Sequence, residues 1–235
     1  GKALVNLLDL KDEKVTSVIS VKEFKDYLMM ATQKGIVKRI KMEEFSSPRK
    51  GGIKAMKTAE NQDTLISVNP IKENQEVLLV TKHGQAIRFN SNEVRPMGRS
   101  SYGITGIKLN KGDEVVSQEV LPLKNQAEES IITITEKGYG KRTAIDDYRL
   151  TGRAGKGVIN IKVTDKTGDV VTSHSVKEKD TVIVSSAKGI VIRSPLKNIR
   201  VMGRATQGVR IMNLQDEDKV TDLTTVKELE DDESI

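Results

Sequence analysis

The stretch Thr135-Glu136-Lys137-Gly138-Tyr139-Gly140-Lys141-Arg142 is one of four related octapeptides in this 235-residue chain. Each octapeptide has a hydroxyl residue three positions before a glycine and an arginine four positions after it. The other three begin at Thr32, Thr81 and Ser186, and successive glycines are 49, 54 and 51 residues apart. A repeat of this period is typical of propellers and structural arrays, not of a single unrepeated core.

Each repeat contains four short segments that are rich in Val, Ile and Thr and are bounded by Gly, Asn, Asp and Lys, a composition typical of strands and turns. The first two segments flank the shared glycine, which is expected at a hairpin turn with positive φ, while the hydroxyl residue bonds the turn backbone. The third strands are expected at Gly52-Ile53-Lys54, Gly106-Ile107-Lys108, Gly157-Val158-Ile159 and Gly208-Val209-Arg210. The fourth strands are expected at residues 64–68, 114–117, 169–172 and 219–222.

The N-terminal residues match only the second half of a repeat. Leu4-Val5-Asn6-Leu7 is similar to Val158-Ile159-Asn160-Ile161, and residues 15–19 are similar to residues 220–223. Four strands in about 50 residues is the content of a propeller blade. The sequence therefore predicts an all-β, propeller-like protein of about five four-stranded blades with an incomplete first blade, or a larger ring cut short.

Charged residues are distributed unevenly along the chain. The formal net charge is +6, but the last 20 residues carry −7, so residues 1–215 carry +13. A body this basic points to a polyanionic partner, and the acidic end points to a segment that competes for the same surface. We therefore predict one domain at residues 1–227 and an acidic tail at residues 228–235 that weakens binding of the polyanion.

The residue content argues against several functional classes. There is no cysteine and there are two histidines, so we expect no metal site. No stretch has the roughly 18 to 20 apolar residues that cross a bilayer, and we expect no membrane partner. Aromatic residues make up 3% of the chain, which disfavours base stacking. Since the serines lack a His and Asp pairing and the glycine-rich segments lack the Lys-Ser/Thr ending of a phosphate loop, we expect no catalytic site.

Three longer strings carry a resemblance to a known family. They are Val94-Arg95-Pro96-Met97-Gly98-Arg99, Gly138-Tyr139-Gly140-Lys141-Arg142-Thr143 and Val201-Met202-Gly203-Arg204-Ala205-Thr206-Gln207-Gly208-Val209. With them, essentially the whole chain resembles the C-terminal domain of the DNA gyrase A protein. In that family the domain is a β-pinwheel, a propeller-like disc whose blades exchange strands, and it wraps DNA around a basic rim. The resemblance implies this fold and a DNA-binding domain at residues 1–227.

The resemblance also implies partners and cofactors outside this stretch of sequence. The family's enzyme is a type IIA topoisomerase in which two gyrase A proteins and two ATPase proteins form an A2B2 assembly that uses ATP and Mg²⁺. Its DNA-cleaving tyrosine lies in another domain, so the present fragment is expected to be non-catalytic and to hold no cofactor. The absence of cysteine fits the cytoplasmic, nucleoid-associated location that the resemblance implies.

One departure from the family leaves alternatives open. Gyrase members carry a Gln-Arg-Arg-Gly-Gly-Lys-Gly box, and related but degenerate strings occur here at residues 48–54 and 152–157. If the box lies upstream of Gly1, gyrase-type wrapping is implied. If the protein lacks it, the corresponding protein of the paralogous topoisomerase IV, which decatenates or relaxes DNA without chiral wrapping, is the better interpretation. A propeller that binds protein partners ranks lower, because its loops offer few aromatic anchors.

Cations that recur once per repeat are the candidates for contact with duplex DNA. One set closes each second strand, and for it the alternative is pairing with an acid between blades. The other set lies in loops, where glycine beside arginine exposes N–H groups and permits close approach, so the loop set is favoured. The candidates are Arg39, Arg49, Lys50, Arg88, Arg95, Arg99, Lys141, Arg142, Arg149, Arg153, Lys156, Arg193, Arg200 and Arg204.

Overall fold

The structure is a computed structural model, and it describes residues 15–47, 52–58, 63–124 and 126–227. These residues form strands joined by turns, loops and short 3₁₀ turns, which confirms the all-β prediction. No helix in the described ranges has the length and apolar character required to span a membrane. The candidates Arg49 and Lys50, the strand predicted at residues 4–7 and the acidic tail at residues 228–235 lie outside the described residues.

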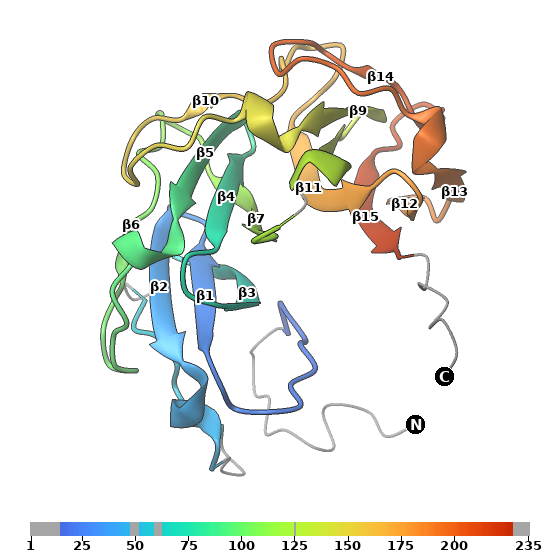
Figure 1. Cartoon of the computed structure of the whole chain (residues 1–235). Helices are drawn as coiled ribbons and strands as arrows, with labels where there is room; N and C mark the ends of the chain where they lie inside the picture. Colours follow the sequence, from blue (N-terminus) through green and yellow to red (C-terminus); the bar gives the residue numbers. More distant parts are fainter. Residues whose placement is uncertain (1–14, 48–51, 59–62, 125, 228–235) are drawn as a thin grey trace.

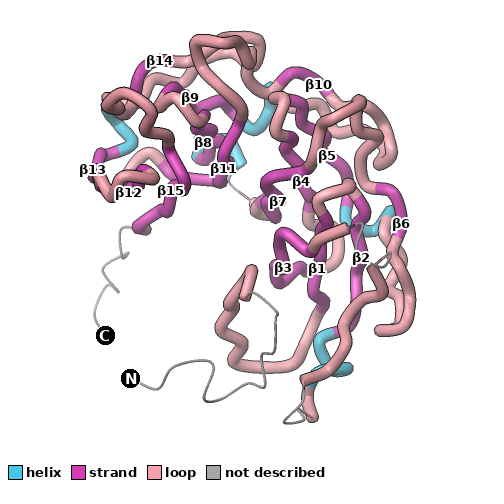
Figure 2. Tube along the Cα trace, turned by 180° about the vertical axis from the view of Figure 1, so that it is seen from behind, coloured by secondary structure: helices cyan, strands magenta, loops and turns pink. Residues whose placement is uncertain are grey.

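Four antiparallel sheets, called blades 1 to 4, follow one another along an arc (Figures 1 and 2). Blade 1 contains β3 (Leu65–Ile71), β1 (Tyr27–Thr32), β2 (Ile36–Lys41) and β6 (Ile104–Thr105), in that order. Blade 2 contains β10 (Val158–Ile159), β5 (Gln85–Asn90), β4 (Glu76–Thr81) and β7 (Val115–Leu121). Blade 3 contains β11 (Val170–Lys177), β8 (Glu129–Thr135), β9 (Tyr139–Ala144) and β14 (Val209–Arg210). Blade 4 contains β13 (Val191–Pro195), β12 (Thr181–Ser186) and β15 (Val220–Val226).

Short 3₁₀ turns follow the second strand of each repeat, and one more precedes β8. They are η2 (Met42–Phe45), η3 (Ser91–Glu93), η4 (Gln126–Glu128), η5 (Ile145–Asp147) and η6 (Leu196–Asn198). The strands β3, β7, β11 and β15 lie on the inner side of the arc, and β6, β10 and β14 lie on its outer side (Figure 1).

Neighbouring repeats exchange a strand at the outer edge of blades 1, 2 and 3. β6 follows β5 along the chain, but it pairs with β2 of the preceding blade. In the same way β10 pairs with β5, and β14 pairs with β9. This exchange is the arrangement that the resemblance implied, and it confirms the β-pinwheel fold.

The hairpins also follow the sequence pattern. The four shared glycines have φ between 79° and 84°. In three repeats the hydroxyl oxygen accepts a hydrogen bond from the residue four positions ahead, as Thr32 Oγ1 does from Ile36 N at 3.2 Å. In the remaining repeat the Thr135 hydroxyl donates to the Tyr139 carbonyl instead. The repeated hydroxyl and glycine are therefore turn residues.

Apolar side chains from neighbouring blades pack together between the sheets. Met29 and Val37 of blade 1 meet Leu79 and Phe89 of blade 2, and similar cores lie between blades 2 and 3 and between blades 3 and 4. The first and second strands of blades 1 to 3 are therefore covered on both faces. In β12, by contrast, buried and half-buried residues alternate, so one face of blade 4 is less covered.

Three strand predictions need correction. Residues 15–19 and 52–54 form no strand. Residues 15–19 were predicted as a fourth strand, which would pair with the first strand of its own repeat. Residues 52–54 were predicted as a third strand, which would pair with the preceding blade. The described residues contain neither partner. Ile19 instead packs against the face of blade 1 that points away from blade 2. The strand predicted at residues 106–108 lies two residues earlier, at β6.

A histidine joins the inner strands of three blades. His174 of β11 lies 3.2 Å from the Glu119 carboxylate of β7. Burial alone would lower the pKa of His174, but the hydrogen bond and charge of Glu119, a backbone contact at Leu223 and the charge of Asp222 together raise it. The imidazolium form therefore stabilises the packing of blades 2, 3 and 4.

This contact predicts a pH dependence of stability. Because the pKa of His174 is raised in the folded state, its stabilising contribution is complete below the unfolded pKa of about 6.5 and is lost as pH rises through the folded pKa. We expect the unfolding free energy of His174→Gln to lie furthest below that of the unchanged chain at pH 5.5 and closest to it at pH 8.5. Urea titrations at the two pH values measure the difference. If the difference in unfolding free energy between the two chains is the same at both pH values, the assignment is wrong. In a chain that already carries Glu119→Gln, the effect of His174→Gln should no longer depend on pH.

The hairpin glycines give a second, internally controlled prediction. A Cβ atom at Gly138 would overlap the backbone carbonyl of Met212, whereas a Cβ at Gly189 meets no atom within 4 Å, and both residues have positive φ. Gly189→Ala should therefore cost about 1 to 2 kcal/mol, the ordinary penalty of a left-handed residue. Gly138→Ala should cost clearly more, because its neighbour is backbone and cannot move aside. Equal losses in urea unfolding would show that the loop at Met212 is not held against the turn.

Candidate nucleic-acid interface

Three loops lie along the outer edges of blades 1 to 3, and we call residues 95–103, 149–157 and 200–208 the outer loops. Each is fixed at its start to the second strand of the preceding blade. The backbone N–H groups of Met97, Thr151 and Met202 donate to the carbonyls of Arg39, Arg88 and Arg142 at 2.8 to 2.9 Å. Each loop ends in the exchanged strand β6, β10 or β14, so every outer loop spans one sheet edge.

The second and third outer loops are also joined to the segments that follow the preceding exchanged strands. Ala154 N donates to Gly106 O at 2.6 Å, and Lys108 N donates to Gly155 O at 2.9 Å. Lys162 N donates to Thr206 O at 2.9 Å. Backbone hydrogen bonds therefore tie each of these two loops to the chain that continues from the loop before it, along the outside of the arc.

The first arginine of each outer loop is exposed at the same structural position. Each of Arg95, Arg149 and Arg200 comes directly before a residue that forms a β-bridge with the second strand of the preceding blade. Within the described part of the chain, their guanidinium groups have no hydrogen-bond or ion-pair partner. The structure thus places one such arginine, without a partner among the described residues, on the outer side of each of blades 1 to 3. Lys156 is exposed on the second of these loops.

The second arginine of each outer loop is held by the protein. Arg153 donates from Nη1 to Thr105 O at 2.9 Å, and Arg204 donates from Nη1 to Ile159 O at 2.9 Å. Both guanidinium groups therefore bond the exchanged strand of the preceding loop, and both residues are half-buried. Arg99 is more exposed and forms an ion pair with Glu44 at 3.2 Å. These arginines support the loops and have less freedom to bind a ligand.

Three arginines that close second strands are buried, which corrects the prediction that they contact DNA. Arg88 is 8% exposed; it bonds the Glu76 carboxylate at 2.6 Å and the carbonyls of Ile145 and Tyr148 at the 3₁₀ turn of the next repeat. Arg142 and Arg39 reach the corresponding turns, at the Ile199 carbonyl and the Asn92 side chain. All three arginines make internal contacts, but the predicted pairing with an acid between blades holds only in part: Arg88 pairs with Glu76 of its own blade, Arg142 lies 3.7 Å from Glu178, and Arg39 bonds the Asn92 amide oxygen.

Arg193 is the fourth member of this set, and its environment differs. The described residues include no following repeat for it to contact, and the side chain is exposed on β13. The same sequence position therefore gives a buried clamp in blades 1 to 3 and a solvent-facing cation in blade 4.

Lys141 was also predicted to contact DNA, and this too is corrected. Its side chain is fully buried, and Nζ donates to the carbonyls of Gly203 and Arg204 at 2.7 and 2.6 Å. Burial and the nearby Arg204 charge lower the pKa of Lys141 to about 8, although Asp147 opposes the shift. Lys38 occupies the same position in blade 1 and is equally buried; burial lowers its pKa, and Glu44 partly offsets this.

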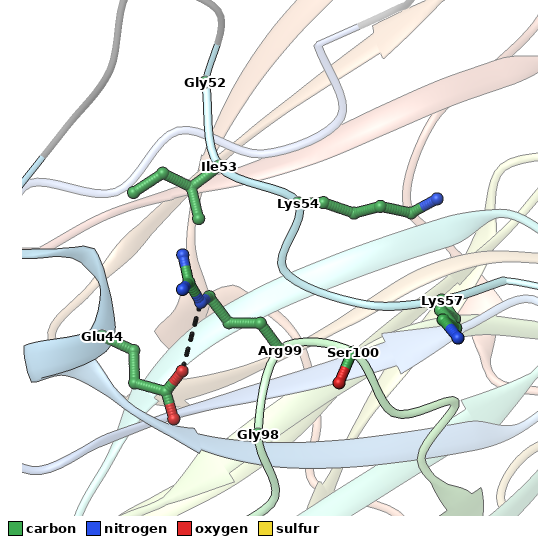
Figure 3. A pocket seen from close by; sticks show the side chains of 8 residues that line it. All are labelled: Glu44, Gly52, Ile53, Lys54, Lys57, Gly98, Arg99 and Ser100. Atoms are coloured by element: carbon green, nitrogen blue, oxygen red, sulfur yellow. Dashed lines mark ion pairs between the residues drawn. The ribbon is translucent and has the colours of Figure 1, made fainter.

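A basic hollow of about 540 Å³ lies beside the first outer loop (Figure 3). Lys54 and Lys57 line it together with Arg99 and Ser100. Arg99 is turned toward Glu44, whereas the two lysines extend away from that pair (Figure 3). The lysines were missing from the predicted set, although Lys54 shares with Lys108 and Arg210 a place two residues after the glycine of the predicted third strand. That recurrence was a usable signal.

Comparison with known proteins agrees with this architecture. The family "DNA gyrase C-terminal domain, beta-propeller" matches at residues 26–72, 75–120, 129–177 and 180–227, one match for each repeat. The C-terminal domain of DNA topoisomerase IV superposes with a TM-score of 0.88 and 22% identity over 97% of this chain and 71% of that one. The DNA gyrase A C-terminal domain gives 0.84 and 24% over 95% and 74%.

Curated relatives give the same family. The DNA gyrase A protein of Chlamydia muridarum (strain MoPn / Nigg) is 38% identical over 223 residues, which are 93% of this chain and 26% of that protein. The DNA gyrase A protein of Salmonella typhimurium (strain LT2) is 39% identical over 238 residues, or 100% and 26%. This chain therefore spans about a quarter of the length of these relatives.

The strand exchange and the basic outer loops define a β-pinwheel domain of the kind found in bacterial type IIA topoisomerases. The four family matches cover most of the residues and coincide with the repeats. The chain belongs to the DNA gyrase C-terminal domain family.

The burial of Arg88 and the exposure of Arg193 predict that the same substitution has different effects on stability at equivalent positions of two repeats. Replacing Arg88 by Met removes four hydrogen bonds and leaves the half-buried Glu76 carboxylate without its paired cation, so we expect a loss of about 3 to 5 kcal/mol in unfolding free energy. Arg193→Met, at the equivalent exposed position, should change it by less than about 0.5 kcal/mol. Urea unfolding followed by circular dichroism measures both. Similar losses in the two variants would overturn the clamp assignment.

Proposed function

We propose that this chain is the DNA-binding and DNA-bending domain of the gyrase A protein of a type IIA topoisomerase, and that it holds duplex DNA on its outer side. The observation that carries the proposal is the recurrence of an unpaired arginine at the same structural position, Arg95, Arg149 and Arg200, on the outer edges of three consecutive blades. Lys156, Lys54 and the partly engaged second arginines add positive charge along the same path.

The energetics of bending favour such a repeated arrangement. Curving 20 to 30 base pairs by 40 to 90° costs on the order of 1 to 6 kcal/mol. One cation cannot offset this, but several contacts in series can. Because backbone hydrogen bonds tie the loops to the sheets and to the segments that follow the neighbouring exchanged strands, their spacing is set when the protein folds and not when DNA binds. The contacts are expected to involve phosphates and to be independent of base sequence.

The whole enzyme's activity is part of the proposal. The curated relatives named above are gyrase A proteins, which favours gyrase over the topoisomerase IV alternative. We propose that the rest of the gyrase A protein, together with its ATPase partner, completes the assembly in the bacterial cytoplasm, with ATP and Mg²⁺ acting there. The described residues hold no group of three or more His, Cys, Asp or Glu side chains that could bind a metal. We propose that this domain positions DNA for the rest of the enzyme.

A salt titration tests the proposal. Each phosphate neutralised contributes a slope of about −0.9 to the dependence of log K on log salt. Replacing Arg95, Arg149 and Arg200 together by Gln should weaken binding of a short duplex by more than about tenfold at 50 mM salt and make the slope shallower by about 2 to 3. Fluorescence anisotropy of a labelled duplex, measured over a salt series, gives both quantities.

The matched control removes the same charge from another surface. Lys34, Lys137 and Lys188 are exposed at the tips of three hairpins, at one end of the strands. Replacing these three by Gln should leave most of the affinity and most of the slope. If this variant loses as much as the arginine variant, the chain binds DNA through its net charge, and the outer-edge assignment is wrong. If the unchanged chain shows no salt-dependent binding, the proposed function itself is wrong.

A further inference from the structure

The centre of each outer loop is filled by a side chain from the strand beneath it. In blades 1, 2 and 3 this residue is Lys38, Ile87 or Lys141, three positions after the hairpin glycine. In each case the residue before it pairs with the strand that ends the loop, and the residue after it bridges to the start of the loop. The central side chain therefore lies under the loop and is enclosed by it.

The two lysines donate to backbone carbonyls of the outer loops, and Lys38 also donates to Ala55, outside them. Lys38 Nζ donates to the carbonyls of Ala55, Arg99 and Ser101 at 2.8, 3.0 and 3.2 Å. Lys141 Nζ makes the equivalent contact with Arg204 and a further one with Gly203. A buried ammonium group with several carbonyl acceptors fixes the direction of those peptide units, because an alternative orientation would leave a charge without a partner.

Turning a carbonyl inward turns the next N–H outward, since the two groups point in opposite directions across a trans peptide. The Arg99 carbonyl faces Lys38, so the Ser100 N–H faces away from it. The Arg204 carbonyl faces Lys141, and the Ala205 N–H faces away in the same manner. Both residues are exposed, and within the described ranges neither N–H donates to a protein acceptor. Each lysine thus presents a solvent-facing donor at the outer edge.

Blade 2 shows the outcome without a cation at the centre. Ala154 is the equivalent of Ser100 and Ala205, and its N–H is already used by Gly106 O at 2.6 Å. The N–H before it, that of Arg153, donates to the Glu93 carboxylate at 2.9 Å. In the second loop, which has Ile87 beneath it, both of these N–H groups are therefore hydrogen-bonded to protein acceptors. Donor availability follows the identity of the central residue.

We propose that Lys38 and Lys141 are positioning residues that hold the N–H groups of Ser100 and Ala205 outward as donors to the phosphates of duplex DNA. This inference rests on the proposed function, because the phosphates are those of the bound duplex. Backbone N–H groups are common phosphate donors in protein–DNA complexes. Ser100 lines the same hollow as Lys54 and Lys57, where the Glu44 carboxylate is paired with Arg99 (Figure 3), so two cations line the hollow beside this backbone donor.

The first test observes the donors directly. Amide ¹H–¹⁵N spectra of the 235-residue chain, recorded with and without a short duplex, should show the amide protons of Ser100 and Ala205 moving downfield when DNA binds. The amide of Ala154, which is already bonded to protein, should stay in place. A role confined to filling space would move none of the three.

The second test changes the central residues. Lys38→Met and Lys141→Met keep an unbranched apolar chain of similar length and remove the donor, while Ile87→Met is the control without a change of charge. Losing one hydrogen bond to phosphate should weaken duplex binding about three- to tenfold in each lysine variant. Ile87→Met should stay within about twofold of the unchanged chain.

The outcomes separate this inference from the proposed function. If the unchanged chain binds duplex but the Ser100 and Ala205 amides do not shift, the positioning role is wrong and the DNA-binding function stands. If the lysine variants bind as tightly as the unchanged chain, the inference is also wrong. If a lysine variant does not fold, the spectra of the unchanged chain still decide. If the unchanged chain does not bind duplex at all, the proposed function fails first.

Discussion

The pairing of sheet edges is the constraint on which the rest of this structure depends. An unpaired edge strand exposes a row of N–H and C=O groups that need partners. Blades 1 to 3 satisfy their outer edges with a loop and a two-residue strand from the following repeat. This solution places a glycine- and arginine-containing loop on the outside of each of these blades. The same exchange that closes the sheets therefore determines where the cations are displayed.

Neighbouring repeats, more than residue identity, decide what each repeated residue does. Arg88 and Arg193 follow their hairpin glycines at the same distance, yet one is a buried clamp with four hydrogen bonds and the other faces solvent. The hairpin glycines differ in the same way, since the chain crowds Gly138 and leaves open space around Gly189. In both cases the difference is the presence or absence of a following repeat among the described residues. A repeat protein of this kind gives one sequence motif several physical roles.

The repeat pattern was sufficient to predict the hairpins, the inner strands and the all-β class, because these depend on local turn chemistry and on β-branched runs. Strand exchange came from the family resemblance, since spacing cannot show which blade a short strand joins. The candidate interface was predicted in part. Lys141 and Arg142 are successive residues that alternation would send to opposite faces, but both are buried because neighbouring blades cover the faces and the outer loop covers the edge. The sequence favoured the loop arginines, but the difference between the buried Arg88 and the exposed Arg193, which share one sequence position, required the packing.

Under the proposed function, the outer loops hold a bent polyanion without a flexible binding surface. Their backbones are hydrogen-bonded to the sheets and to the segments that follow the neighbouring exchanged strands, so the arginine-bearing segments are ordered when the protein folds. Preorganisation of this kind lowers the entropic cost of binding. The curvature of the surface follows from the angle between packed blades, which the interblade cores and the buried arginines fix together. Under the proposed function, each added blade extends the arc by one more loop and so lengthens the duplex that the domain holds. The energy available to bend that duplex then grows in steps, one blade at a time.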